Sequence, residues 1–235
     1  MTGTPAATLT ILSGGGIMGP MNELGPRFER ETGCKTVIQF EASPALIACA
    51  TSGAPFDLCV APREVFANAA VRARFTAAPT TDIARDGLGV AFRAGAPKPD
   101  IGTAKNLKAA LLAARSVSTL LASATGGQIM SVFKTLGIAE AMQGKLKLQP
   151  SPAAIPQAVA NGEAELGIFL INVLMAPGVE LAGPFPPEVQ QELVFTSAVT
   201  TDSKATETAR AFIDYLRTPA AAAVIRDKGM QPVAP

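Results

Sequence analysis

The segment that decides the fold is Leu9–Gly33, which reads LTILSGGGIMGPMNELGPRFERETG. It starts with a short apolar run that is typical of a β-strand, and a loop of small residues, Ser13–Gly16, follows the run. The next apolar residues recur at the spacing of one helical face: Ile17, Met21, Leu24 and Phe28. Gly33 is typical of the residue just beyond a helix end. The segment therefore predicts a strand, a tight loop and a helix.

The same order repeats along the chain. Further strands are predicted at 35–40, 57–61, 86–92, 116–122, 145–148, 166–170 and 192–199, and helices at 45–51, 64–74, 104–114, 129–136, 153–160 and 205–217. Strands that alternate with helices favour right-handed βαβ units and a mainly parallel sheet. The fold class predicted from this pattern is α/β.

The repeats fall into two sets. A connector near Thr80–Asp86 separates them, and the chain returns to the first set after Thr196. We therefore expect two lobes joined by a hinge with two crossings, the first made of residues 1–82 plus 197–235 and the second of residues 83–196. A cleft between hinged lobes is a common place for a ligand.

The composition argues against several classes of function. Of the 235 residues, 48% are hydrophobic, and 20 basic side chains face 19 acidic ones. With almost no net charge, one tyrosine and no tryptophan, we expect neither a nucleic-acid surface nor membrane insertion. No apolar run approaches the roughly 20 residues that would cross a bilayer.

The absence of histidine restricts the chemistry further. Ser-His and Cys-His nucleophile pairs and histidine-ligated metals are impossible, so a carboxylate, lysine, cysteine or tyrosine must carry any proton transfer. The three cysteines, Cys34, Cys49 and Cys59, lack metal-ligand spacing. We expect neither a metal nor a cofactor.

The N-terminus shows neither the basic nor the apolar part of a secretory signal. The sequence as written predicts a cytoplasmic location. A periplasmic location is expected instead if an export signal was trimmed.

Five short loops follow predicted strands and open predicted helices: Ser13–Gly16, Glu41–Ser43, Pro62–Arg63, Ser123–Gly127 and Ile171–Asn172. Ligands of parallel sheets bind beyond the carboxyl ends of the strands, where helix N-termini point. Small residues and hydroxyls there favour anion capture by backbone N–H groups. Each loop alone is better explained as a plain turn or cap, and only their convergence across both lobes predicts a site.

The predicted ligand-binding residues are Ser13, Gly14, Gly15, Gly16, Ser43, Arg63, Ser123, Thr125, Gly126, Gly127 and Asn172. Arg63 is the candidate countercharge, although an arginine on the first turn of a helix is as often simply solvated. Glu41 is the candidate base if the protein is an enzyme.

A dinucleotide site is a competing interpretation of the first loop. Gly14, Gly16 and Gly19 satisfy G-x-G-x-x-G between a strand and a helix, and Glu41 lies where a ribose-binding acid is expected. Against this interpretation, Pro20 follows the third glycine, and a dehydrogenase without histidine would need an unusual acid or base.

Several segments resemble the molybdate-binding proteins of ABC transporters. They are the strand and small-residue loop at 9–16, FEAS at 40–43, SGAPFD at 52–57, NGEAELGI at 161–168 and TPAAA at 218–222, together with FERETG at 28–33. The resemblance covers nearly the whole chain. It implies the type II periplasmic-binding-protein fold, a hinged cleft that holds a small anion with hydroxyls and amides, and an ABC permease as partner if the protein is exported.

The family's ligand residues carry over only in part. Ser43 falls on the second-loop serine, but the first-loop serine falls near Gly16 and the expected tyrosine falls at Leu170. A larger or flatter anion, such as a carboxylate, is therefore expected in place of tightly bound molybdate. The family includes similar proteins described as aconitate isomerases, in which the cleft supports proton transfer in a tricarboxylate. The leading hypothesis is a solute-binding protein, with an isomerase of an unsaturated di- or tricarboxylate and a dinucleotide-binding enzyme as alternatives.

Overall fold

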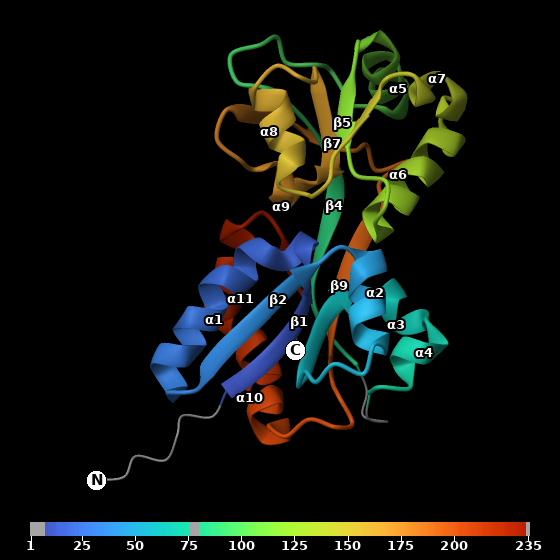
Figure 1. The fold of residues 1–235 in the computed structure, drawn as a ribbon. Helices are drawn as coiled ribbons and strands as arrows, with labels where there is room; N and C mark the ends of the chain where they lie inside the picture. Colours follow the sequence, from blue (N-terminus) through green and yellow to red (C-terminus); the bar gives the residue numbers. More distant parts are fainter. Residues whose placement is uncertain (1–7, 76–79, 234–235) are drawn as a thin grey trace. The chain divides into compact units, whose positions relative to one another are not determined.

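A computed structural model describes residues 8–75 and 80–233 (Figure 1). The chain divides into two compact units. Unit 1 comprises Met1–Arg85 and Val194–Pro235, and unit 2 comprises Asp86–Leu193. Both unit boundaries fall inside long strands, β4 (Thr81–Arg93) and β9 (Glu192–Val199). The N-terminal residues on which the location was predicted lie outside the described part of the chain.

Unit 1 is built on a sheet with the strand order β2-β1-β3-β9-β4, and a short strand β10 is paired with β4. Its first half contains β1 (Thr8–Gly14), the 3₁₀-helix η1 (Gly15–Ile17), α1 (Met18–Thr32), β2 (Lys35–Glu41), α2 (Ser43–Thr51), β3 (Leu58–Pro62), α3 (Arg63–Ala67) and α4 (Ala69–Arg72). After β9, the chain adds α10 (Thr206–Leu216), α11 (Pro219–Asp227) and β10 (Gln231–Pro232).

Helices cover both faces of this sheet (Figure 1). Leu12 of β1 and Cys59 of β3 pack with Leu46 of α2 and Val65 of α3 in one apolar cluster. Helices α1, α10 and α11 pack together, and the ring of Phe28 meets that of Phe212 edge-on at 5.0 Å. Strand β1 is accordingly buried from Ile11 to Gly14, as a strand covered on both faces must be.

Unit 2 is built on the strand order β4-β7-β5-β6, with β8 also paired to β4. Along the chain it contains α5 (Ala104–Ala113), β5 (Val117–Thr119), α6 (Ala124–Thr135), α7 (Ala139–Gln143), β6 (Leu146–Leu148), α8 (Ala154–Ala160), β7 (Leu166–Leu170), α9 (Ile171–Leu174) and β8 (Val179–Pro184). Its strand β7 is buried throughout, as a strand covered on both faces must be.

The α/β prediction is confirmed, but the sheets are mixed rather than mainly parallel. β1 is parallel to β2 and β3, and β5 is parallel to β6 and β7. β9 runs antiparallel to β3, and β4 runs antiparallel to β7 and β8. The antiparallel strands include β4 and β9, which carry the chain from one unit into the other. The alternation of strands and helices in the sequence does not reveal the direction of these two strands.

Three local predictions were wrong. The expected connector at 80–86 is mostly strand, because β4 already begins at Thr81. The expected helix at 64–74 is broken by the extended residue Asn68, whose side chain caps α4 through the N–H groups of Ala70 and Val71. The expected turn at 123–127 is already the start of α6.

A buried carboxylate joins the two chain segments of unit 1. The Asp57 side chain accepts hydrogen bonds from the Thr10 N–H at 3.0 Å, the Thr10 hydroxyl at 2.7 Å and the Ser203 hydroxyl at 2.8 Å. Burial raises the pKa of Asp57, but these hydrogen bonds outweigh burial and leave the pKa below its usual value. Asp57 is therefore structural, which agrees with its place at the start of β3.

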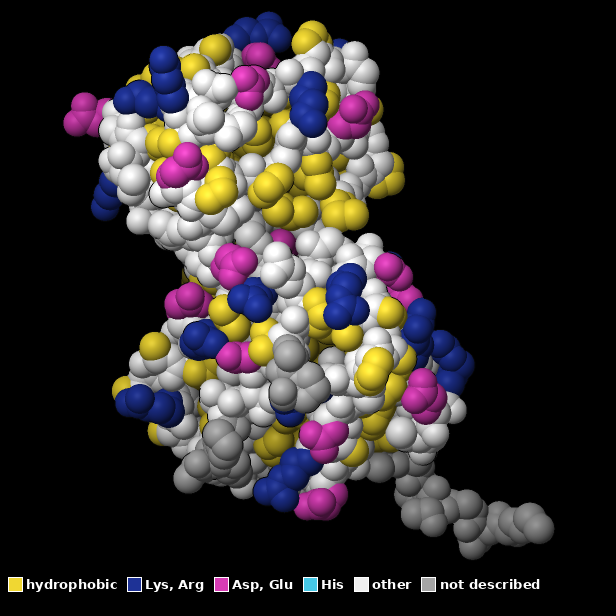
Figure 2. Space-filling model, turned by 180° about the vertical axis from the view of Figure 1, so that it is seen from behind, with side chains coloured by type: hydrophobic (Ala, Val, Ile, Leu, Met, Phe, Trp, Pro, Cys, Tyr) yellow, Lys and Arg dark blue, Asp and Glu magenta, His cyan; other side chains and the backbone are white. Residues whose placement is uncertain are grey.

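The surface in Figure 2 carries Lys or Arg and Asp or Glu side chains interspersed rather than gathered by sign. None of the helices in the described residues combines the length and apolar character needed to cross a membrane.

Candidate functional site

In unit 1, three of the predicted loops lie at one edge of the sheet. Ser13 pairs with Phe40 of β2 and with Val60 of β3, so the carboxyl ends of the three parallel strands are level with one another. The segments that follow them, η1, α2 and α3, therefore begin side by side. This edge brings together the predicted residues Ser13, Gly14, Gly15, Gly16, Glu41, Ser43 and Arg63.

The first loop offers backbone amides rather than hydroxyls. Ser13 is fully buried in β1, and its hydroxyl makes only a long 3.4 Å hydrogen bond to the carbonyl of Gly14. Gly14 lies so close to its neighbours that a Cβ atom there would be 3.1 Å from Cδ of Pro62. Gly15 and Gly16 form the first turn of η1, which runs directly into α1 and has no side-chain cap. Helical segments with such N-termini favour anions.

Proline in the first turn of α1 is well tolerated. Pro20 is buried at the third position of the helix, where an N–H group has no partner within the helix. Pro20 is therefore compatible with the start of α1. Glu41 is the last residue of β2, which extends one residue beyond the strand predicted at 35–40, and it accepts a hydrogen bond from the Gln39 side chain at 3.0 Å.

The second loop differs from the prediction by one residue. Helix α2 begins at Ser43, and Ala42 is its N-cap, with the Leu46 N–H donating to the Ala42 carbonyl at 2.8 Å. The pair Ser43-Pro44 is typical of an N-cap followed by the first helical residue, so the sequence alone predicts Ser43 as the cap. Alanine has no side-chain acceptor, so α2 has no side-chain N-cap. Ser43 is half-buried at this N-terminus.

Arg63 has a protein partner. Its guanidinium forms an ion pair with Asp82, whose other carboxylate oxygen accepts the Thr196 hydroxyl at 2.6 Å. More than half of the Arg63 side chain is exposed, so the pair is well solvated. Arg63 lies at the predicted edge, but Asp82 already balances its charge.

In unit 2, the parallel strands β5 and β7 end at a second edge, where α6 and α9 begin. The Ser123 side chain caps α6, accepting the Gly126 N–H at 3.0 Å, and the Gly127 N–H donates to the Ser123 carbonyl at 3.2 Å. The amides of Gly126 and Gly127, which were expected to bind the ligand, are thus used within the helix. Because the helix starts earlier than predicted, buried Thr125 occupies the second helical position, where N–H groups lack helical partners.

Gly126 is required by packing rather than by a ligand. A Cβ atom at this position would overlap the backbone carbonyl group of Leu121. At Gly127, by contrast, a Cβ atom would meet no other atom within 4 Å. Only Gly126 therefore fixes how the chain enters α6.

Sequence reasoning missed Asp86, the most perturbed carboxylate of unit 2. The pairing of β4 with β7 reaches Leu88 and Leu170, and just beyond it the backbone N–H of Asn172 in α9 donates to the Asp86 carboxylate at 3.0 Å. Burial raises the pKa of Asp86 to about 7, with hydrogen bonds from the amides of Asn172, Gly87 and Ile171 opposing the rise and the charge of Glu192 adding to it. The loop at 171–172 was predicted to meet a ligand anion, but Asp86 already occupies that amide. An acidic residue inside an apolar strand was the available signal.

A second residue that the sequence did not single out is Thr119, at the end of β5. Its hydroxyl is buried and has no hydrogen-bond partner among the described residues. Buried hydroxyls without partners are uncommon in folded proteins. Thr119 therefore adds an unused hydrogen-bonding group to the edge of unit 2.

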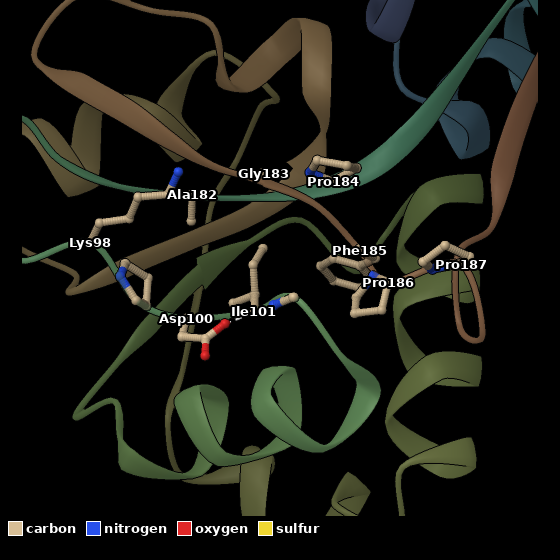
Figure 3. Close-up of a pocket in the computed structure, with 11 residues that line it drawn as sticks. Lys98, Asp100, Ile101, Ala182, Gly183, Pro184, Phe185, Pro186 and Pro187 are labelled. Carbon is tan, nitrogen blue, oxygen red and sulfur yellow. Dashed lines mark hydrogen bonds between the residues drawn. The ribbon is translucent and has the colours of Figure 1, made fainter.

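Unit 2 also holds a pocket of about 520 Å³ that contains none of the predicted residues (Figure 3). It lies between the segment 98–102 and the proline-rich segment 182–187, with the Phe185 ring turned toward Ile101. Asp100 lines it, and its carboxylate is engaged by the Gly102 N–H and the Asn106 side chain. Across residues 8–75 and 80–233, no group of histidine, cysteine, aspartate or glutamate side chains is arranged to hold a metal ion.

The chain is similar to known proteins over nearly its whole length. Residues 9–231 match the family described as bacterial extracellular solute-binding proteins. The chain is 30% identical to an aconitate isomerase from Pseudomonas sp over 97% of its length and 89% of that protein. It is 26% identical to the molybdate-binding protein ModA of Azotobacter vinelandii, over 95% and 90% of the two chains.

Solved structures show the same fold at lower identity. The periplasmic molybdate-binding protein of Azotobacter vinelandii superimposes with a TM-score of 0.75 at 19% identity, covering 97% of this chain and 99% of that one. The sulfate-binding protein SubI of Mycobacterium tuberculosis H37Rv gives 0.76 at 18% identity, covering 97% and 88%. The fold is thus the α/β fold of periplasmic binding proteins, and the chain belongs to the family of bacterial extracellular solute-binding proteins.

Proposed function

We propose that this protein is a solute-binding protein whose ligand is a small organic acid with more than one carboxylate. The observation that carries the proposal is the edge of unit 1, where uncapped N-termini of η1 and α2 follow neighbouring parallel strands. Such N-termini attract negative charge. In this proposal Gly15, Gly16 and Ser43 bind a carboxylate at the edge of unit 1, and Thr125 with the start of α6 binds a carboxylate at the edge of unit 2.

Two features favour a carboxylate over molybdate. Gly16 and Leu170 stand where molybdate-binding proteins are expected to offer hydroxyls, and the nearby Ser13 hydroxyl is buried in β1. A tetrahedral oxyanion stripped of water needs a donor for each oxygen, whereas a flat carboxylate needs fewer. The 30% identical relative is named for its action on aconitate, which is a tricarboxylate.

Calorimetric titration with citrate, the aconitates, succinate, sulfate and molybdate tests the proposal. We expect a di- or tricarboxylate to bind, and Ser43→Ala to weaken its binding about tenfold through the lost donor. Ser52→Ala is the matched control, because Ser52 is the C-cap of the same helix and its hydroxyl bonds locally, donating to the Cys49 carbonyl and accepting from the Ala54 N–H. Molybdate as the tightest ligand, or equal effects of the two substitutions, would refute the assignment.

An isomerase of aconitate is the second candidate function. It is favoured by the same relative and by Asp86, a buried carboxyl group with a pKa of about 7 in a chain that has no histidine. Glu41 would remove a proton from the carbon next to a carboxylate, and a proton returned elsewhere on the same allylic system would complete the isomerisation with no net proton change.

Proton NMR of cis- and trans-aconitate incubated with the protein separates the two functions. Interconversion that Glu41→Gln slows by about a hundredfold supports the isomerase. Tight binding with no interconversion supports the receptor, which would serve a permease. Binding of a dinucleotide in place of either would restore the G-x-G-x-x-G interpretation.

A further inference from the structure

A cavity of about 300 Å³ in unit 1 lies apart from the sheet edge described above. It is bounded by the turn between α10 and α11, one face of α11 and the C-terminal residues Pro232 and Val233. Two arginines line it, Arg217 from the turn and Arg226 from the last turn of α11. None of the residues predicted to bind a ligand belongs to this cavity.

The pattern of α11 explains the hollow. Pro219, Ala222 and Arg226 follow one another at three- and four-residue spacing, so they share one face of the helix. The opposite face, which includes Val224 and Ile225, is buried in the unit. Because alanine stands in the middle of the first face, the side chains around it leave an open volume with apolar walls.

The two arginines lack partners of their own. Neither Arg217 nor Arg226 makes a hydrogen bond or an ion pair through its side chain within residues 8–75 and 80–233, and Nε of Arg217 is buried without any acceptor. Five other arginines are paired with carboxylates, namely Arg27, Arg63, Arg74, Arg115 and Arg210. The exposed Arg30, Arg72 and Arg93 form no ion pair in the part of the chain that the structure describes, but they line no cavity described above. The remaining guanidinium nitrogens of Arg217, and those of the exposed Arg226, also lack acceptors among the described residues, and an anion in the cavity would supply them.

We propose that this cavity is a second anion site that binds a short dicarboxylate. Two guanidinium groups match two carboxylates, because the planar fork of each donates to both oxygens. The apolar walls suit the methylene groups between the carboxylates, and the volume lies at the small end of ligand pockets. The site does not depend on the function proposed above, since it shares no residue with it.

Titration of the ¹⁵N-labelled protein with succinate at low ionic strength tests the proposal, with the amides of Ala222 and Val233 as reporters. We expect both to shift in a saturable way, and Arg217→Gln or Arg226→Gln to weaken the binding about tenfold each. Arg30→Gln is the control, because Arg30 is exposed in the last turn of α1, outside the cavity. It should leave the titration unchanged.

A variant that fills the cavity with a larger side chain keeps the test decisive if an arginine substitution disturbs folding. Ala222→Leu retains both charges and fills the hollow, and we expect it to abolish the shifts. Ser43→Ala should leave them intact, so a failure of this site is distinguishable from a failure of the proposed function. The proposal is overturned if succinate shifts neither reporter at millimolar concentration, if Ala222→Leu binds like the parent, or if inorganic phosphate binds more tightly than succinate.

Discussion

Asp86 gives the clearest prediction for a single residue. Its pKa is raised from 3.8 to about 7, so between these pH values the folded protein holds a proton that the unfolded chain has released. The contribution of Asp86 to the free energy of unfolding therefore falls as pH rises through this window, by up to about 4 kcal/mol. We expect Asp86→Asn to remove this loss and to be roughly 1–3 kcal/mol more stable than the parent at pH 8.

Urea unfolding at pH 5 and pH 8 measures this effect. Asp227→Asn is the control, because Asp227 is exposed at the end of α11 and should not change the pH dependence. If the free energy of unfolding falls by the same amount between pH 5 and pH 8 in the parent and in Asp86→Asn, the burial of Asp86 does not cause the pH dependence.

Asp57 predicts the opposite dependence on pH. Because its folded pKa is lowered, its contribution is fully present above the unfolded pKa and is lost as pH falls through the folded value. Asp57→Ala leaves the Thr10 and Ser203 groups without their acceptor, and we expect a loss of about 2–4 kcal/mol at pH 7. Urea unfolding should show the difference between Asp57→Ala and the parent shrinking below pH 4. Asp214→Asn, on the exposed side of α10, should change little.

The position of a single residue was predicted well where it depends on the local sequence pattern. Its contacts were predicted poorly where they depend on how strands pair. The position of Glu41 at the end of β2 follows from the strand pattern alone. The contact between Asp86 and Asn172 depends on how β4 lies against β7, and the pair of Arg63 with Asp82 joins residues 19 positions apart across the sheet. Neither pairing is written in local sequence.

At the scale of elements, the start of α6 is set by one glycine. Gly126→Ala would drive a Cβ atom into the Leu121 backbone, and we expect a loss of about 2–4 kcal/mol in the free energy of unfolding together with weaker ligand binding. Gly127→Ala is its matched control, since the space there is open and alanine favours a helix by up to about 1 kcal/mol. Thermal unfolding of both variants measures the contrast. Equal melting temperatures would show that the close approach at Gly126 is unimportant.

Helix starts explain most of the errors in the predicted site. Ser123 and Ser43 were both expected near helix N-termini, but only Ser123 is a cap, because Ala42 takes that place in α2. Glycines disfavour helices, so Gly126 and Gly127 were assigned to a turn. The close approach of Gly126 to the Leu121 backbone outweighs the low helix propensity of glycine. Helix α6 therefore starts earlier, and its N-terminal N–H groups include that of Thr125.

For the whole molecule, strand and helix alternation was enough to predict an α/β fold, and the order of short motifs was enough to indicate the family. The sequence does not reveal that β9 runs antiparallel to β3 and β4 runs antiparallel to β7, because the hydrophobic pattern of a buried strand is the same in either direction. The hinge between two lobes stays a prediction. Small-angle scattering should show a smaller radius of gyration once the organic acid is bound, and an unchanged radius would contradict closure.

The central claim is that helix N-termini at the carboxyl edges of the strands bind the ligand. The most direct measurement is the ¹⁵N–¹H correlation spectrum of the protein titrated with the carboxylate that binds tightest in calorimetry. We predict the largest shifts at the amides of Gly15, Gly16, Ser43 and Thr125, with those of Gly33 and Gly95 unmoved. Saturable binding that leaves the resonances of Gly15, Gly16, Ser43 and Thr125 unchanged, and shifts the resonances of other amides, would contradict the claim.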